Sequence, residues 1–456
     1  MAEHAVTEAE AHDGPARSAL SSGRLAILAG SVTALVIASL SGSALGFLNK
    51  AACRAGAWNY GAEQFQAHCY TDIYPLYFGE GLWHGQIPYL DHPVEYPVLI
   101  GAAMQAATWV VHPITNPLIR GREFFDVTVI GLTICALIGV LATAFLAGRS
   151  RRWTALLVAL SPGLILGSFI NWDMIAMALT ALAMVAWAVR RPTAAGVLFG
   201  LAVATKFYPI VLLGALFLLC LRAGKLREFR ATAVGAGVAW LIVNVPIAVL
   251  NFTGWGRFYG LNSTRSADWG SIWYFFETEH WPVLGSLSLS ALNLLSLALF
   301  VVAAALIAVL TLAAPRRPRV AQVFFLILAA FLLVNKVWSP QYVIWLVPLL
   351  VLARPRLWSY LLWQVAEVGY FFAIWAYLIT VSSPGTPGGI GTGLYFCALL
   401  ARFLTVALLG GLVVSDILRP DRDIVRSDGE DDPAGGVLDG APEVFSLRPA
   451  PEPVTT

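Results

Sequence analysis

The sequence contains little charge. Only 12% of its 456 residues are Asp, Glu, Lys or Arg, whereas 58% are hydrophobic. A soluble domain carries roughly 25% charged residues, because polar groups must cover its surface. The composition therefore excludes a water-soluble globular protein. Several apolar stretches reach about 20 residues, the length that crosses a bilayer core, so the sequence predicts an all-α polytopic membrane protein.

Three further shortages narrow the function. The 29 basic and 27 acidic residues nearly balance, and a net charge of +2 gives no reason to expect nucleic acid as a partner. The five cysteines include no Cys-x-x-Cys pair, so their spacing does not indicate a zinc or iron–sulfur site. No internal repeat is visible, which disfavours a transporter built from inverted halves.

Hydropathy predicts twelve membrane-spanning segments. The first runs from Leu25 to about Leu48, and the polar residues 1–24 before it form a cytoplasmic segment too long for the start of a cleaved signal peptide. The segments between residues 153 and 221 are short, so we expect broken helices around a cavity. The other eleven segments lie near residues 124–147, 153–170, 173–189, 193–205, 208–221, 231–250, 284–313, 319–335, 341–353, 357–379 and 391–417.

The basic residues predict the orientation. With the N-terminus in the cytoplasm, twelve spans put every basic cluster on the cytoplasmic side, as the positive-inside rule requires. If the apolar stretch Pro97–Val111 also crossed the membrane, every later basic cluster would lie on the outer side. We therefore interpret this stretch as an interfacial or re-entrant helix of the outer face. The acidic, Pro- and Gly-containing tail, residues 418–456, is expected to be disordered in the cytoplasm. The clusters are Arg149/Arg151/Arg152, Arg190/Arg191, Arg222/Lys225/Arg227/Arg230, Arg316/Arg317/Arg319 and Arg354/Arg356.

Two large loops, about residues 49–123 and 251–283, are then expected on the outer face. The first interleaves aromatic rings with carboxylates and two histidines. Rings can cover the apolar faces of a sugar while a carboxylate deprotonates a hydroxyl; the alternative is an interfacial aromatic belt with solvated acids. The residues concerned are Asp72, Tyr74, Glu80, His84, Asp91, His92, Glu95 and Tyr96.

Cys53 and Cys69 also lie in the first loop, on the expected oxidising side. A disulfide between them would close a loop of about 15 residues, worth about 3 kcal/mol. Two free thiols are the alternative.

Lysine is scarce, with four in the chain, yet Lys206 and Lys336 both follow predicted spans at outer turns. A lysine at headgroup depth suits a lipid phosphate, and Arg265 in the second loop would suit it too. The alternative for each lysine is a snorkelling helix end.

Three acids or bases lie in or at the predicted spans. Asp173 begins a predicted helix, where capping is the alternative to a functional role. Glu367 and Arg402 fall at similar depth in neighbouring spans, so we expect a structural ion pair rather than a proton relay.

Seven short segments, in four groups along the chain, together resemble the polyprenyl-phosphate-sugar-dependent membrane glycosyltransferases of the GT-C fold, most closely glycosyltransferase family 87. The resemblance covers the chain from the first span to about residue 417. The matching segments are Tyr70–Tyr74 with Gly85–Tyr89 and Glu95–Pro97, Ser161-Pro162 with Asn171–Asp173, Gly200–Pro209, and Lys336–Tyr342.

The resemblance implies a GT-C-type bundle, residues 25–417, that moves a sugar, usually mannose, from a polyprenyl-phosphate donor to an envelope glycolipid or glycan. By position it implies Asp72 as catalytic base. The segments of Lys206 and Lys336, with Arg265, are expected to hold the donor phosphate. The expected substrate-binding residues are Tyr74, Glu95, Tyr96, Asp173, Tyr208 and Gln341.

No cofactor is required by this scheme, although Asp72, Asp173 and Glu95 could together bind a divalent metal. Two other functions fit the sequence: a lipid or glycan transporter or flippase, and a catalytically silent partner in envelope assembly. A transporter places its charges near the bilayer midplane, whereas here the candidates gather at the outer interface. The sequence leaves the sugar, the acceptor and the oligomeric state open.

Overall fold

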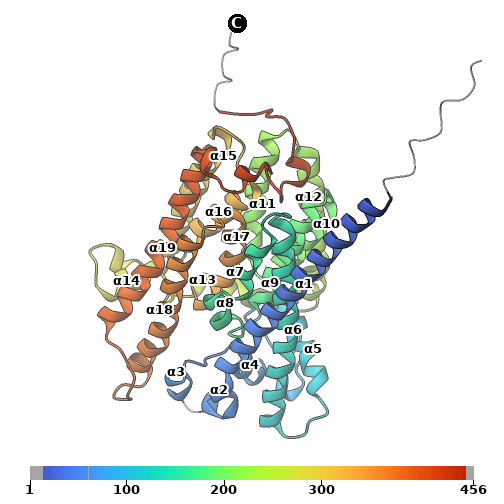
Figure 1. The fold of residues 1–456 in the computed structure, drawn as a ribbon. Coiled ribbons are helices and arrows are strands. Elements are labelled where there is room, and N and C mark those ends of the chain that lie inside the picture. Colours follow the sequence, from blue (N-terminus) through green and yellow to red (C-terminus); the bar gives the residue numbers. More distant parts are fainter. Residues whose placement is uncertain (1–13, 60, 448–456) are drawn as a thin grey trace, which may run out of the picture.

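A computed structural model describes residues 14–59 and 61–447 (Figure 1). The described chain is a bundle of helices, as the sequence predicts. Six helices are long and apolar enough to cross a membrane. They are α1 (Gly14–Asn49, apolar from Ala29), α6 (Pro117–Leu146), α12 (Leu226–Leu250), α15 (Leu289–Ala313), α18 (Leu357–Ser382) and α19 (Thr392–Leu418).

Six shorter apolar helices lie among these. They are α5 (Val98–Val111), α9 (Asp173–Ala188), α10 (Pro192–Val203), α11 (Pro209–Arg222), α16 (Val320–Val334) and α17 (Val343–Ala353), which continues the short turn η5 (Pro340–Tyr342). The segment expected at 153–170 is broken into η3 (Arg152–Ala155), α7 (Leu156–Ala159) and α8 (Pro162–Gly167). The break falls where Ser161 caps α8 by accepting a hydrogen bond from Leu164 N, and where Pro162 offers no N–H to continue α7.

Several boundaries differ from the hydropathy prediction because capping, not hydropathy, sets them. The first helix begins at Gly14 rather than Leu25, so part of the expected polar segment is helical. Asn116 caps α6 through Leu118 N and Ile119 N, which starts this helix at Pro117 rather than 124. The expected segment 1–24 otherwise lies outside the described residues.

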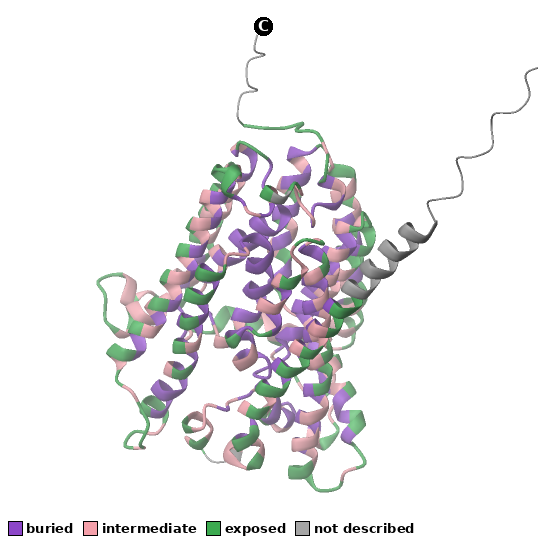
Figure 2. Cartoon of the chain, in the orientation of Figure 1, coloured by how far each residue is buried: buried purple, intermediate pink, exposed green. Residues whose placement is uncertain are grey.

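The core lies along α16 and α17. Every residue of α17 is buried, whereas α15 has only four buried residues and presents apolar side chains outward. Figure 2 shows the buried residues gathered in the centre and the exposed ones on the outer helices. This is the pattern of a bundle whose outer helices face lipid.

The two loops predicted to be large are built from short helices. The first contains α2 (Ala51–Ala55), η1 (Ala57–Asn59), α3 (Glu63–Gln66), α4 (Ile73–Gly79) and η2 (Leu82–His84), and ends in α5. The predicted disulfide between Cys53 and Cys69 is confirmed. The second contains α13 (Phe252–Thr264), α14 (Ile272–Thr278) and η4 (Leu284–Ser286).

The tail differs from the expectation. It was predicted to be disordered, but residues 419–447 pack against the bundle, with Val425, Ala434 and Leu438 buried. Arg319 donates to both carboxylate oxygens of Asp423, at 2.7 and 3.0 Å. Three of the tail acids, Asp423, Asp431 and Glu443, are therefore counter-ions for arginines of the bundle.

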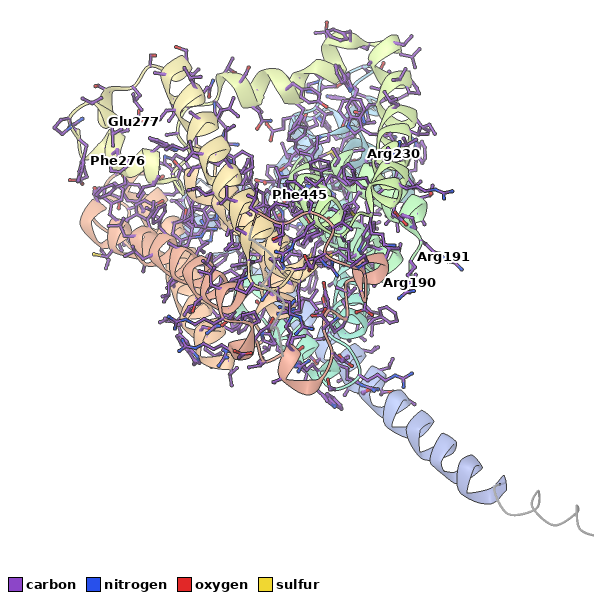
Figure 3. The ribbon with its side chains drawn as sticks, turned by 90° about the horizontal axis from the view of Figure 1, so that it is seen from above. Arg190, Arg191, Arg230, Phe276, Glu277 and Phe445 are labelled. Carbon is purple, nitrogen blue, oxygen red and sulfur yellow. A yellow bond between two sulfur atoms is a disulfide. The ribbon has the colours of Figure 1, made fainter. Side chains whose placement is uncertain are left out.

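The tail reaches all five connections that carry the basic clusters, so these connections lie at one end of the bundle. The start of α1 lies at the same end (Figure 1), and Figure 3, which looks down on it, shows Phe445 of the tail over the middle and Arg190, Arg191 and Arg230 at its edge. The pairs are Arg151–Ile424 O, Trp187–Gly435 O, Arg222–Glu443, Arg317–Leu438 O and Arg356–Arg422 O.

We predict that Asp423→Asn lowers the thermal midpoint of unfolding, because it leaves the buried Arg319 guanidinium without a counter-charge. The loss of one partner of a buried pair costs about 3–5 kcal/mol. The exposed Asp421→Asn in the same tail is the matched control and should shift the midpoint little. Equal midpoints for the two variants, measured in detergent by tryptophan fluorescence, would contradict the packed tail.

Candidate active site

A cavity of about 760 Å³ lies at the end of the bundle opposite the tail. Its lining comes from the connections that alternate along the chain with the tail-contacting ones. These are the first loop, the turns at 170–171 and 206–208, the second loop and residues 331–345, together with one face of α18. The volume is that of a small-molecule site.

Asp72 lies on the wall formed by the first loop. It precedes α4 but does not cap it; its Oδ1 instead accepts a hydrogen bond from Tyr70 Oη at 2.7 Å, and its Oδ2 accepts one from Tyr96 Oη at 3.1 Å. Burial raises the pKa of Asp72 to about 6, the bonds from the two tyrosines oppose the rise, and the nearby Glu95 adds to it. The carboxylate is thus held in place and is a stronger base than a solvated one.

The segment that carries Asp72 is fixed from several sides. Asp72 N donates to Ile170 O at 2.7 Å, and Thr71 Oγ1 donates to Phe169 O at 2.6 Å. Behind the wall, the ammonium of Lys50 donates to Tyr70 O at 2.8 Å. Lys50 is only 1% exposed, and its burial lowers its pKa to about 7.

Asp173 and Lys206 form an ion pair beside this wall, with 2.8 Å between Nζ and Oδ1. Trp345 Nε1 donates to the other Asp173 oxygen at 3.1 Å. The Lys206 ammonium also lies over the rings of Tyr96 and Tyr342, at 5.2 and 5.5 Å from the centroids. Burial alone would lower the pKa of Lys206, but the charge and hydrogen bond of Asp173, together with Tyr342 and Asp72, outweigh it and raise the pKa, so the lysine is cationic.

Tyr208 supports the same corner. Its ring stacks on Trp345 with 4.5 Å between centroids, and its hydroxyl shares a hydrogen bond of 3.1 Å with Thr180 Oγ1. Tyr208 lines the cavity, which is where a substrate-binding residue has to lie.

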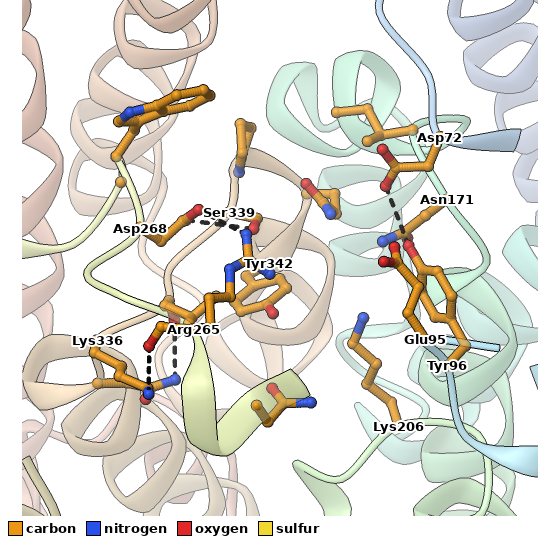
Figure 4. A pocket seen from close by; sticks show the side chains of 18 of the residues that line it. Asp72, Glu95, Tyr96, Asn171, Lys206, Arg265, Asp268, Lys336, Ser339 and Tyr342 are labelled. Carbon is orange, nitrogen blue, oxygen red and sulfur yellow. Dashed lines mark hydrogen bonds and ion pairs between the residues drawn. The ribbon is translucent and has the colours of Figure 1, made fainter. Parts of the chain in front are cut away.

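Two more cations face Asp72 from the opposite wall (Figure 4). Arg265 pairs with Asp268 at 2.9 Å. The Lys336 ammonium donates to Arg265 O at 2.6 Å and to Ser263 O at 3.5 Å; burial and the Arg265 charge both lower its pKa. Lys336 therefore also holds the second loop against residues 335–342.

The predicted Glu367–Arg402 pair is confirmed, with 2.9 Å between Oε2 and Nε. Arg402 also binds the turn that precedes Gln341. Arg402 donates to Trp338 O at 3.0 Å and to Ser339 O at 3.1 Å, and its guanidinium lies 4.4 Å from the centroids of both Trp338 and Tyr370. This buried arginine fixes the turn that brings Gln341 to the cavity.

Three buried side-chain groups that belong to lining residues have no hydrogen-bond partner among the described residues. They are Gln341 Oε1, Asn171 Nδ2 and Trp375 Nε1. Buried polar groups are nearly always paired, and an unpaired one costs about 1–3 kcal/mol. All three atoms are enclosed by protein, and other unpaired buried groups lie away from the cavity, so a ligand would bond to them only after these side chains turn toward it.

The structure brings most of the predicted site residues together. Two of the expected substrate-binding residues, Tyr74 and Asp173, do not line the cavity. Tyr74 is buried within the first loop, stacked on Trp58 at 4.5 Å, because its position on α4 turns it away. Asp173 instead holds Lys206. The lining residues are Asp72, Glu95, Tyr96, Lys206, Tyr208, Arg265, Lys336 and Gln341.

The carboxylates Asp72, Glu95 and Asp173 do not assemble a metal site, since Asp173 is engaged with Lys206 and Trp345. Across residues 14–59 and 61–447, no group of three or more His, Cys, Asp or Glu side chains has the arrangement of one.

Four residues at or behind the cavity wall have no role that the sequence predicts: Tyr70, Asn171, Lys50 and Trp375. Tyr70 and Asn171 lie within two residues of Asp72 and Asp173, which is a signal that could have found them. Lys50 is a lysine that directly follows a predicted span and lies under the loop. Trp375 carries no such signal, because it reads as one of many aromatic residues in a membrane helix.

The fold is a polytopic helical bundle, and its cavity is lined by the carboxylate of Asp72 and by the cations Lys206, Arg265 and Lys336. These features are typical of membrane enzymes and carriers. The profile of glycosyltransferase family 87 matches residues 89–340, more than half of the chain. The chain belongs to this family and is a membrane glycosyltransferase. Asp72 precedes the matched range and Gln341 directly follows it. No curated protein matches the chain.

Asp72 is expected from the sequence to be the catalytic base, and on that expectation we predict that turnover falls as the pH drops through about 6, where the pKa of its carboxylate lies and the group becomes protonated. Tyr70→Phe removes a hydrogen bond that lowers the pKa of Asp72, so the acidic limb should move to higher pH. Tyr259→Phe, on another part of the cavity lining, should leave the limb in place. The measurement is the pH dependence of kcat/KM for sugar transfer; an unmoved limb in Tyr70→Phe would contradict this assignment.

Proposed function

We propose that this glycosyltransferase moves a sugar, with mannose as the first candidate, from a polyprenyl-phosphate donor to an envelope glycolipid or glycan. The observation that carries the proposal is the division of one cavity into two walls. Asp72 and Glu95 lie on one wall, and Arg265 and Lys336 face them from the other (Figure 4). Sugar transfer needs a base that deprotonates the acceptor and cations that neutralise the leaving phosphate of the donor. The first wall supplies the base, and the second supplies the cations.

In the proposed reaction, Asp72 accepts the proton of an acceptor hydroxyl. The hydroxyl oxygen attacks the anomeric carbon of the donor from the side opposite the phosphate. The bond between that carbon and the phosphate oxygen breaks, its electron pair leaves with polyprenyl phosphate, and the new glycosidic bond has inverted configuration. The two tyrosines keep the Asp72 carboxylate directed at the acceptor.

The leaving phosphate gains negative charge in the transition state, which nearby cations stabilise. Arg265 is the best placed of the three. Among the described residues, its guanidinium bonds only to Asp268, through Nη2, so Nε and Nη1 remain for phosphate oxygens. Lys206 is already paired with Asp173 and Lys336 with two carbonyls, so each offers its remaining donors. We propose that these side chains, without a cofactor, neutralise the phosphate.

A lipid-linked donor suits the place of the cavity. It lies at helix ends of a bundle with lipid-facing outer helices, and it is lined by apolar as well as charged residues, including Leu261, Phe331 and Leu378. The basic connections all lie at the other end, with the tail, and the positive-inside rule assigns that end to the cytoplasm. We therefore propose a cell-membrane enzyme with both termini in the cytoplasm and the site on the outer face.

We predict that Asp72→Asn abolishes transfer, because the amide cannot accept the proton, while the protein stays folded. The assay gives purified protein in lipid a radiolabelled polyprenyl-phosphate mannose and a crude envelope glycolipid. Glu63→Gln, an exposed acid in the same loop, is the matched control and should keep full activity.

Turnover retained by Asp72→Asn would remove Asp72 as the base. If the unaltered protein transfers nothing from this donor, other polyprenyl-phosphate sugars such as arabinofuranose come next. Failure with all of them would favour the silent-partner function over the enzyme.

We predict that Arg265→Gln raises the KM for the donor about tenfold or more, because a charge-assisted bond to phosphate contributes about 1.5–3 kcal/mol. The arginine is 43% exposed, so its replacement should not unfold the protein. Arg257→Gln in the same loop does not change the cavity lining and serves as control. An unchanged donor KM in Arg265→Gln would show that the phosphate binds elsewhere.

A further inference from the structure

Three aromatic rings form a continuous surface on the Asp72 side of the cavity. The Tyr70 ring stacks on Trp375 with 4.7 Å between centroids, Phe65 stacks on Trp375 at 6.0 Å, and Phe65 and Tyr70 lie 5.9 Å apart. All three line the cavity. Phe65 and Tyr70 are half-buried, whereas Trp375 is 3% exposed and backs them. We call this surface the aromatic wall.

The aromatic wall joins parts of the chain that are about 300 residues apart, and it is held firmly. Cys69, which forms the disulfide with Cys53, directly precedes Tyr70. The carbonyl oxygen of Tyr70 accepts a hydrogen bond from the Lys50 ammonium. Gln66, next to Phe65, donates from Nε2 to Pro387 O at 2.8 Å, in the connection between α18 and α19. A surface fixed in this way can bind a rigid ligand without first losing the entropy of its own side chains.

The aromatic wall is bonded directly to the proposed base. The Tyr70 hydroxyl donates to Asp72 at 2.7 Å, so a flat ligand that lies against the Tyr70 ring has its edge near the carboxylate. A ligand with an apolar ring face and hydroxyl groups at its rim would stack on the rings and bond to the carboxylate, and this is the chemistry of a pyranose.

We propose that the aromatic wall binds the acceptor, and that it takes an uncharged pyranose ring whose hydroxyl is presented to Asp72. This proposal rests on the proposed function for the role of Asp72, and it adds which wall holds the acceptor and which chemical class it accepts. The opposite wall, with Arg265 and Lys336, is left to the donor phosphate.

The charges around the aromatic wall explain why the pyranose that it binds should be uncharged. Asp72 and Glu95 both line this side of the cavity. Of the cations whose charge reaches it, Lys206 is already paired with Asp173, and Arg265 lies on the opposite wall. A uronic acid or a phosphorylated sugar would bring a third negative charge to this side and would compete with the donor phosphate for Arg265. The two carboxylates thus act against acidic acceptors, a repulsive element of specificity.

The test measures sugar binding separately from transfer. Full-length protein in lipid nanodiscs is examined by saturation-transfer difference NMR with methyl α-D-mannopyranoside and with its uronate. The neutral sugar should bind, and the uronate should bind at least about tenfold more weakly. Phe65→Leu and Trp375→Leu should each weaken binding of the neutral sugar about threefold to tenfold.

Two further variants serve as controls. Trp109→Leu removes a tryptophan that is 70% exposed and lies on α5 outside the cavity lining, so it should leave sugar binding unchanged. Asp72→Asn should keep sugar binding although it loses transfer, because stacking does not need the base.

The outcomes separate the two proposals. Sugar binding that depends on Phe65 and Trp375, in a protein that transfers nothing from any polyprenyl-phosphate sugar, supports the aromatic wall and overturns the proposed function. Binding that is insensitive to both variants, no binding of the neutral sugar, or equal binding of the uronate overturns the aromatic wall whether or not transfer occurs.

Discussion

The high free-energy cost of burying charge in a lipid environment governs this molecule. A charge at membrane depth must be paired or it destabilises the fold by several kcal/mol. The buried pairs Glu367–Arg402, Asp173–Lys206 and Arg319–Asp423 all meet that requirement. Each pair also does something else: one fixes a turn of the cavity, one holds a lysine at its wall, and one attaches the tail.

The exception defines the site. Glu95 makes no side-chain hydrogen bond among the described residues, and Arg265 has donors to spare. Two charged side chains with unused bonding capacity thus lie on opposite walls of one cavity, which marks it as the place for a polar ligand. Family membership and cavity chemistry thus point to the same location.

The sequence predicted what depends on composition and local order, and it failed where distant segments meet. Hydropathy found the bundle, the broken segment at 153–170 and the depth that Glu367 shares with Arg402. It could not show that Tyr74 turns inward on α4, because a one-residue difference in helical phase decides between the cavity and the loop's own core. Nor could it find Trp375, whose partners Phe65 and Tyr70 lie about 300 residues away.

The tail illustrates the same limit in a different way. Its acidic composition is typical of disorder, yet Asp423 and Glu443 are the partners of arginines that close the bundle. These acids are also synthesised after all the helices of the bundle. While the helices insert, the arginines of the basic connections are still unpaired, and in the orientation proposed above they would serve as the positive charge that fixes topology. The tail can pair with them only afterwards, so the same side chains would act first in insertion and then in holding the tail.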